Sequence, residues 1–170
     1  MIRVVVTGSE STGKSELARA LAAHYRTAWA PEFVRDYLEG KGSALDASDV
    51  ESIARGQIAR EDAAVARAAG IVILDTDLLS TVVYARHYYG SCSLWIERAA
   101  RERMADLYLL LDIDVPWTLD GQRDRADRRE EMHALFADAL RGLDVRTVLI
   151  GGSWEERRVR AIEAIDALLS

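Results

Sequence analysis

Short apolar runs alternate with longer amphipathic stretches along the whole chain. Five short runs predict strands, at residues 2–6, 27–30, 71–75, 107–113 and 145–150. Apolar positions with helical spacing predict helices at residues 14–25, 32–40, 47–69, 78–89, 93–105, the latter part of 118–142, and 153–170. Strands that alternate with helices indicate an α/β fold, in which a central parallel sheet carries helices on both faces.

Four helix ends have recognisable signals. Gly40 is expected to end one helix and Ser48 to cap the next, which would run as far as Gly70. Ser153, followed three residues later by Glu156, predicts a capping box at the start of the last helix. The chain has no internal repeat or Pro/Gly/Ser linker, so residues 1–170 are expected to form a single domain.

The junctions where strands lead into helices are the expected place for chemistry, because parallel sheets bind ligands at the carboxyl ends of their strands. The first junction matches the pattern G-x-x-x-x-G-K-[ST] without a mismatch, through Gly8, Ser9, Glu10, Ser11, Thr12, Gly13, Lys14 and Ser15. Glycines let the backbone wrap around an anion, and the following helix adds a favourable dipole. The motif predicts a nucleoside triphosphate with Mg²⁺, with Lys14 at the β- and γ-phosphates and Ser15 on the metal. A glycine-rich turn without a ligand is the alternative.

Three acidic residues follow the next two strands. Glu32, directly after Pro31, is positioned to orient or deprotonate an acceptor hydroxyl, although glutamate also favours any helix start. Asp75 ends a buried strand and is expected to hold Mg²⁺, directly or through water. Asp77 would serve the ribose hydroxyls of the acceptor or cap the following helix. Which of Asp75 and Asp77 serves the metal stays open.

Composition narrows the possible functions. The 170 residues carry a net charge of −6, which argues against a nucleic-acid partner. A single cysteine, short apolar runs and no recognisable leader indicate a cytoplasmic protein without a membrane segment.

The chain has no asparagine, so the Asn-Lys-x-Asp segment with which GTPases read guanine is missing. A ring-forming ATPase would need a further helical domain. No pattern encodes the oligomeric state, and a homo-oligomer is left open.

Several stretches together resemble the ribosylnicotinamide kinase domain of the NadR-type NAD-biosynthesis proteins, a family in the P-loop kinase superfamily. The matching segments are GSESTGKS, EFVRDY, the GQ of IARGQIARED, ILDTDLLST and LLLDIDVPWTLDGQRD, in the order of that family. The resemblance implies a nucleoside-kinase-like fold and ATP as phosphate donor. The adenylyl-transfer and DNA-binding activities of the multifunctional members are not expected of this chain.

The resemblance also suggests acceptor and lid residues. Arg35 would hold an acceptor oxygen or a carboxylate and Asp36 an acceptor oxygen, with an exposed helix start as the alternative for both. Gln57 would bond an amide of the acceptor or lie exposed on its helix. Aromatic candidates for stacking on a cationic nicotinamide ring are Trp29, Tyr84, Tyr88 and Trp117. Core packing is the alternative for each of them.

A lid is expected at about residues 118–131, where arginines alternate with acids. Arg123 and Arg128 are predicted to close over the phosphates, whereas Arg125 and Arg129 are expected on the surface. A solvated, salt-bridged face is the alternative for the whole segment.

These features predict phosphorylation of the 5′-hydroxyl of nicotinamide riboside by ATP, with Lys14, Glu32, Asp75 and Arg123 as the catalytic groups. Two other functions stay open. One is a kinase for another nucleoside or small metabolite, with GTP not excluded as donor. The other is a P-loop ATPase that regulates a partner protein.

Overall fold

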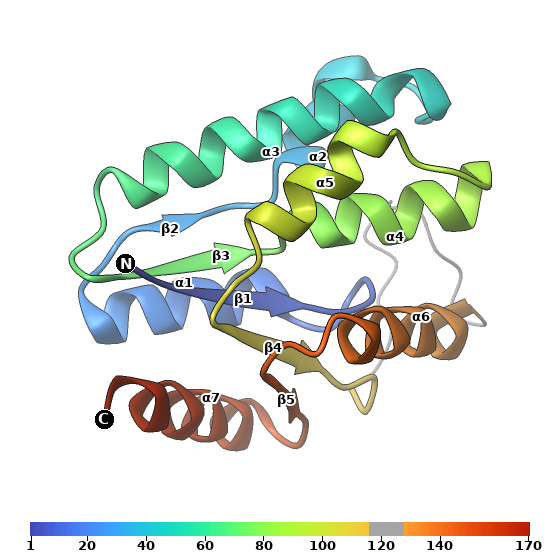
Figure 1. Ribbon diagram of the computed structural model, residues 1–170. Helices are drawn as coiled ribbons and strands as arrows, with labels where there is room; N and C mark the ends of the chain where they lie inside the picture. Colours follow the sequence, from blue (N-terminus) through green and yellow to red (C-terminus); the bar gives the residue numbers. More distant parts are fainter. Residues whose placement is uncertain (116–127) are drawn as a thin grey trace.

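The computed structural model describes residues 1–115 and 128–170, which form a three-layer α/β structure (Figure 1). All strand pairs are parallel, and the sheet order is β2-β3-β1-β4-β5. The strands are β1 (Ile2–Thr7), β2 (Trp29–Ala30), β3 (Ile71–Asp75), β4 (Leu107–Leu111) and β5 (Thr147–Ile150). The helices are α1 (Lys14–Tyr25), α2 (Phe33–Lys41), α3 (Val50–Val65), α4 (Leu78–Tyr89), α5 (Leu94–Glu102), α6 (Arg129–Gly142) and α7 (Trp154–Leu169). The predicted fold class is confirmed.

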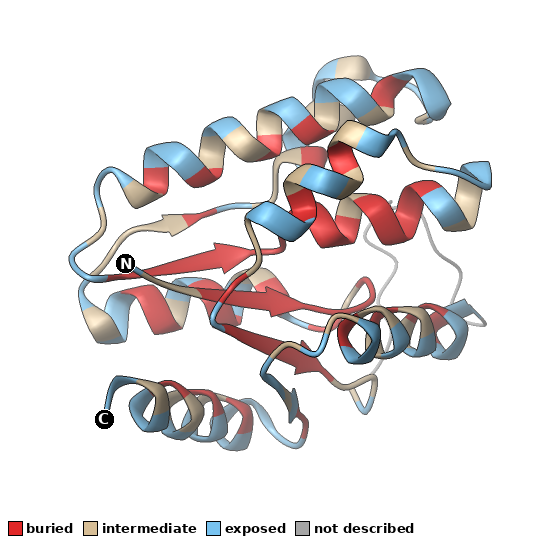
Figure 2. Cartoon of the chain, in the orientation of Figure 1, coloured by how far each residue is buried: buried red, intermediate tan, exposed pale blue. Residues whose placement is uncertain are grey.

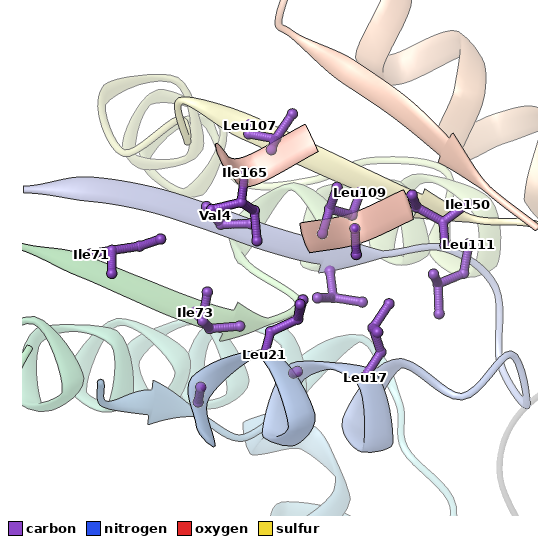
Figure 3. Close-up of a cluster of buried hydrophobic side chains, with 14 residues drawn as sticks. Val4, Leu17, Leu21, Ile71, Ile73, Leu107, Leu109, Leu111, Ile150 and Ile165 are labelled. Atoms are coloured by element: carbon purple, nitrogen blue, oxygen red, sulfur yellow. The ribbon is translucent and has the colours of Figure 1, made fainter. Parts of the chain in front are cut away.

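The three central strands are buried on both faces, so their apolar runs have no polar alternation (Figure 2). Odd and even residues along these strands point to opposite layers. On one face, Val4, Ile73 and Leu109 pack with residues of α1 and α7 (Figure 3). On the other face, Val5 and Tyr108 belong to a second cluster, which includes residues of α3, α4 and α6.

The strand order places β1 at the point where the chain changes direction across the sheet. From β1 the chain first builds β2 and β3 on one side, and then β4 and β5 on the other. In open parallel sheets, ligands bind at the carboxyl ends of the strands beside such a point. The segment that leaves the carboxyl end of β1 is residues 8–13, the predicted phosphate loop.

Some helix ends differ from the sequence-based expectation. Helix α2 continues through Gly40 to Lys41, because Gly42 adopts the left-handed conformation (φ 69°) and donates its N–H to the Leu38 carbonyl. Before α3, Asp46 rather than Ser48 is the capping residue, and it accepts from the Ser48 N–H.

Helix α3 ends at Val65, well before Gly70. At the start of α7, the predicted capping box of Ser153 and Glu156 is confirmed. Within residues 1–115 and 128–170, no helix combines the length and the apolar character needed to cross a membrane.

Candidate active site

Residues 8–13 form a loop between β1 and α1 whose backbone adopts conformations that side chains rarely allow. Gly8 has φ 132° and Gly13 has φ 86°, and Ser11 is also left-handed at φ 55°. A Cβ on Gly8 would lie 3.1 Å from the Leu111 carbonyl oxygen, so the loop passes close to β4 at this point. The sequence places glycine where the chain must turn tightly, and α1 begins immediately after the loop, at Lys14.

The side chains of the loop fold back onto it. The Lys14 ammonium donates to the Ser9 carbonyl oxygen (2.8 Å), and the Thr12 hydroxyl donates to the same oxygen (2.9 Å). Lys14 is only 9% exposed, so its charge is held at the loop rather than in solvent. A helix N-terminus, left-handed backbone and a buried lysine together provide the positive potential that a phosphate group requires.

Ser15 and Asp75 join the loop to the end of β3. The Ser15 hydroxyl donates to Asp75 Oδ2 (2.6 Å), while the buried Asp75 Oδ1 has no hydrogen-bond partner among the described residues. Burial raises the pKa of Asp75, and the nearby charge of Glu32 raises it further. The Ser15 hydrogen bond, Lys14 and Arg35 act in the opposite direction. Ala30 of β2 pairs with Leu74 of β3, so Glu32 and Asp75 follow the ends of adjacent strands.

The pair of Ser15 and Asp75 fits a magnesium ion. Mg²⁺ prefers hard oxygen ligands and is usually held by few protein groups together with substrate phosphates. A hydroxyl already bonded to a carboxylate, with one buried carboxylate oxygen lacking a partner, offers such ligands. In the part of the chain that the structure describes, no group of three or more His, Cys, Asp or Glu residues forms a separate metal site.

Two arginines hold the backbone of the phosphate loop, a role that the sequence did not predict for either of them. Arg157 on α7 is 2% exposed and donates to the carbonyl oxygens of Thr12 (3.1 Å), Asp112 (3.1 Å) and Gly152 (2.9 Å). It also forms an ion pair with Asp114. One side chain therefore ties together the phosphate loop, the end of β4 and the turn before α7. The sequence does contain a signal for its burial. Arg157 lies four and eight residues before the buried Ala161 and Ile165, and therefore on the same face of α7.

Arg129, expected on the surface, is instead buried at the start of α6. It donates to the carbonyl oxygens of Val115 (2.7 Å) and Ser11 (3.2 Å). The preceding residue, Arg128, is exposed. Successive helical positions point about 100° apart, which explains why only one of two neighbouring arginines reaches the loop. Arg123 and Trp117 lie outside the described residues, as does most of the expected lid.

Glu32 lies directly before α2 and is partly buried beside a cavity of about 470 Å³. Residues of α2, α3 and α4 and the connecting segments line this cavity, including Glu32, Val34, Leu38, Leu45, Val50, Ile53, Gln57, Thr76, Ser80, Thr81, Tyr84, Tyr88 and Tyr89. The volume is in the range of small-molecule sites, and the walls are mostly apolar with a few polar groups, as in many such sites.

Two of the predicted aromatic residues face this cavity. The rings of Tyr84 and Tyr88 are parallel within 5°, with centroids 6.0 Å apart. Trp29 is a residue of β2 and does not line the cavity. The Arg19 guanidinium lies 5.7 Å from the centroid of its ring.

Asp77 has a structural role, in which both oxygens of its carboxylate accept hydrogen bonds from the protein. One oxygen accepts from the Leu79 N–H (3.1 Å) at the start of α4, and the other accepts from the Tyr108 hydroxyl (2.7 Å). The side chain is buried and does not line the cavity. The alternative of a helix cap therefore describes Asp77, and we leave it out of the proposed acceptor site.

Asp36 and Gln57 also have partners within the protein. Asp36 is ion-paired with Arg60 of α3, and its side chain is 60% exposed. Gln57 lines the cavity, but its amide oxygen accepts from the Phe33 N–H (3.0 Å). The structure thus groups Lys14, Ser15, Glu32 and Asp75 at one edge of the sheet. Arg35 is exposed on α2, and Asp36 is turned toward α3.

A phosphate loop at the carboxyl end of β1, a carboxylate at the end of β3 and a five-stranded parallel sheet define a P-loop nucleotide-binding protein. A family model described as an AAA domain matches residues 3–157, and the chain belongs to this family. That description names a class of P-loop domain and no reaction.

Individual proteins are more informative about the class. The chain is 31% identical, over 98% of its length, to the trifunctional NAD biosynthesis/regulator protein NadR of Escherichia coli, strain K12. It spans only 42% of that protein. It also superposes with a TM-score of 0.86 on a crystal structure of NadR protein in complex with NR, at 28% identity, over 96% of this chain and 50% of that one. A crystal structure of NadR protein in complex with NAD and AMP-PNP superposes with a TM-score of 0.83, at 27% identity, over 96% of this chain and 48% of that one.

A thymidylate kinase from Ehrlichia chaffeensis has the same fold, with a TM-score of 0.67 at 16% identity, over 98% of each chain. The expected P-loop kinase fold and the resemblance to NadR-type proteins are therefore confirmed.

Proposed function

We propose that this chain is a kinase that transfers the γ-phosphate of ATP to the 5′-hydroxyl of nicotinamide riboside, which would form nicotinamide mononucleotide. The observation that carries the proposal is the position of Glu32, which lines the cavity and follows the end of β2, next to the end of β3 where Asp75 bonds Ser15. An acceptor in the cavity would then lie beside the terminal phosphate of a nucleotide in the loop.

The proposed donor is ATP. A lysine held at the loop, the N-terminus of α1 and the loop N–H groups suit three successive phosphates. NadR protein, which superposes on nearly the whole chain, has been crystallised with the ATP analogue AMP-PNP. Ser15 and Asp75 would hold Mg²⁺, which when bound neutralises charge on the phosphate oxygens.

The proposed acceptor is a nucleoside. Glu32 would accept a hydrogen bond from the attacking hydroxyl and orient its oxygen toward the γ-phosphorus, in line with the leaving oxygen. Lys14 would stabilise the charge that develops on the transferred group. The parallel rings of Tyr84 and Tyr88 give the cavity an aromatic wall suited to a flat base. NadR protein has been crystallised with NR (nicotinamide riboside), which supports this acceptor over other nucleosides.

A substrate panel tests the proposal. Purified protein is incubated with Mg²⁺, with ATP or GTP, and with nicotinamide riboside, a purine nucleoside, a pyrimidine nucleoside or no acceptor, and products are identified by mass spectrometry. We expect nicotinamide mononucleotide and ADP in equal amounts. Phosphorylation of a pyrimidine nucleoside alone would remove the proposed acceptor. ATP hydrolysis with no phosphorylated nucleoside would favour the regulatory ATPase instead.

A further inference from the structure

One face of helix α3 contacts both strand-to-helix junctions that carry the proposed active-site carboxylates. Gln57 Oε1 accepts from the Phe33 N–H (3.0 Å), directly after Glu32. Gln57 Nε2 donates to the Thr76 carbonyl oxygen (3.4 Å), directly after Asp75. Gln57 is 3% exposed. A single buried amide thus bridges the backbone next to Glu32 and the backbone next to Asp75.

Both bridged segments need external support. Thr76 is a β-branched residue at φ 63°, a left-handed conformation that costs of the order of 1–3 kcal/mol unless its surroundings hold it. At the other junction, Phe33 is the first residue of α2, whose N-terminal N–H groups have no partner inside the helix. The side chain of Glu32, the N-cap residue of α2, makes no capping hydrogen bond. The Gln57 amide supplies an acceptor at one junction and a donor at the other.

Neighbouring residues on the same face of α3 reinforce the junction at Glu32. A Cβ on Gly56 would lie 2.2 Å from the Phe33 ring, so only glycine lets α3 approach α2 this closely. Arg60 donates to the Glu32 carbonyl oxygen (3.1 Å), and its guanidinium lies 4.9 Å from the centroid of the Phe33 ring. Both polar groups of the peptide bond between Glu32 and Phe33 are therefore held by α3, the carbonyl by Arg60 and the N–H by Gln57.

Glu61, one turn after Gln57, determines which way the amide faces. Its Oε1 accepts from Gln57 Nε2 (3.4 Å), and its Oε2 accepts from Arg3 (2.8 Å) and Arg103 (3.2 Å). In its ionised form the Glu61 carboxylate can only accept, so it favours the NH₂ end of the amide and leaves Oε1 for the Phe33 N–H. Glu61 is fully buried and does not line the cavity, and any effect it has on an acceptor must pass through its neighbours.

We infer that Gln57 is a positioning residue that sets the spacing between the Glu32 and Asp75 junctions, and that Glu61 fixes its orientation. This differs from the expectation that Gln57 reads an amide of the acceptor. The inference rests on the proposed kinase function for its kinetic consequence. Its structural consequence, the hydrogen bond to the Phe33 N–H, is independent of any substrate.

Three variants and one control test the inference. Gln57→Leu removes all three polar contacts at similar side-chain size. Gln57→Glu puts a carboxylate against the Thr76 carbonyl oxygen and Glu61. In Glu61→Gln, the new amide must turn its oxygen toward Arg3 and Arg103, which can only donate hydrogen bonds. Its NH₂ group then faces the NH₂ group of Gln57, and two donors cannot bond each other. Asp62→Asn is the matched control, because exposed Asp62 also pairs with Arg103 but has no contact with Gln57.

The first measurement is hydrogen exchange of the Phe33 amide by NMR on the full chain. We expect exchange to be about tenfold faster in Gln57→Leu and Glu61→Gln, the effect of losing one hydrogen bond, and unchanged in Asp62→Asn. Parent-like protection of Phe33 in both variants would overturn the inference. Should Glu61→Gln fail to fold, Gln57→Leu alone decides this outcome.

The second measurement is steady-state kinetics, begun with the parent. If the parent phosphorylates no nucleoside, the proposed function fails, while Phe33 exchange still decides the positioning role. If the parent is active, we expect kcat to fall about 10²-fold in the three variants with the KM for ATP within about twofold, as for a misplaced catalytic group. A rise in acceptor KM alone in Gln57→Leu would mean that Gln57 contacts the substrate directly. A lower melting temperature with parent kcat would mean a purely structural role. Either result overturns the inference.

Discussion

The phosphate loop and the acceptor cavity lie at the same edge of the sheet, yet they are built in different ways. The loop, residues 8–13, and the first two residues of α1 form one contiguous segment, in which backbone conformation and Lys14 provide the site. The cavity is assembled from side chains spread over residues 32–89, on three helices and the segments that connect them. Under the proposed function, triphosphate binding would therefore depend on a short local pattern, and acceptor choice on tertiary packing. Variants in the two regions should separate nucleotide binding from acceptor chemistry.

The largest effect is expected from Lys14→Ala, in the loop. The lysine is buried against the loop carbonyls and is proposed to stabilise charge on the transferred phosphate. We expect turnover to fall by about 10³-fold or more, with an unchanged melting temperature in the absence of nucleotide. A kinase assay and thermal unfolding with and without ATP measure both quantities. A folded variant with parent activity would contradict the proposed role of the loop.

On the cavity side, Glu32→Gln is expected to lower kcat by about 10²–10⁴-fold, because the amide cannot accept the proton of the acceptor hydroxyl. The Kd for ATP, measured by calorimetry, should be unchanged. Glu39→Gln, at an exposed position of the same helix, is the matched control. Loss of ATP binding in Glu32→Gln would instead assign Glu32 to the nucleotide side.

Arg157→Ala tests how the loop is held. It would leave the carbonyls of Thr12, Asp112 and Gly152 without their donor and Asp114 without its ion pair. We expect a loss of about 3–5 kcal/mol in the free energy of unfolding, because each buried carbonyl left without a donor costs about 1–3 kcal/mol, together with a higher KM for ATP. The adjacent Arg158→Ala removes only a surface pair with Glu155 and should change stability by about 0.5 kcal/mol or less. Equal effects at both positions would contradict the supporting role of Arg157.

The smallest expected effect is the pH dependence of stability due to Glu61. Burial raises its pKa from 4.5 to about 7, the charge of Asp77 adds to the rise, and Arg3 and Arg103 oppose it. The folded protein therefore holds this proton more tightly than the unfolded chain. The stabilisation is complete below pH 4.5 and is lost as the pH rises through about 7.

Urea unfolding of the parent and Glu61→Gln at pH 5 and pH 8 measures this contribution. The parent should lose up to about 3 kcal/mol relative to the variant between the two values. A constant difference between parent and variant would show that Glu61 does not titrate in this range.

The difference between a contiguous loop and a site assembled from several elements also explains which features the sequence predicted. The strands and the phosphate loop follow from local patterns, since periodicity and motif spacing are properties of neighbouring residues. Ser15 and Asp75 were each assigned to Mg²⁺ from their own junctions, but the hydrogen bond between them, 60 residues apart, was not predicted. The roles of Arg129 and Arg157 were missed, because their partners are carbonyl groups of the loop more than 100 residues earlier. Asp77 was ambiguous for the same reason, as its partner Tyr108 is 31 residues away. Side-chain partners at long range depend on the fold and leave little trace in a single sequence.

The most direct test of the whole account is a crystal structure of the chain with AMP-PNP, Mg²⁺ and nicotinamide riboside. The account predicts the γ-phosphate against Lys14 and the loop N–H groups, with the nicotinamide ring in the α2–α3–α4 cavity and the 5′-hydroxyl within hydrogen-bond distance of Glu32. A triphosphate outside residues 8–15, or a riboside bound away from Glu32, would contradict it.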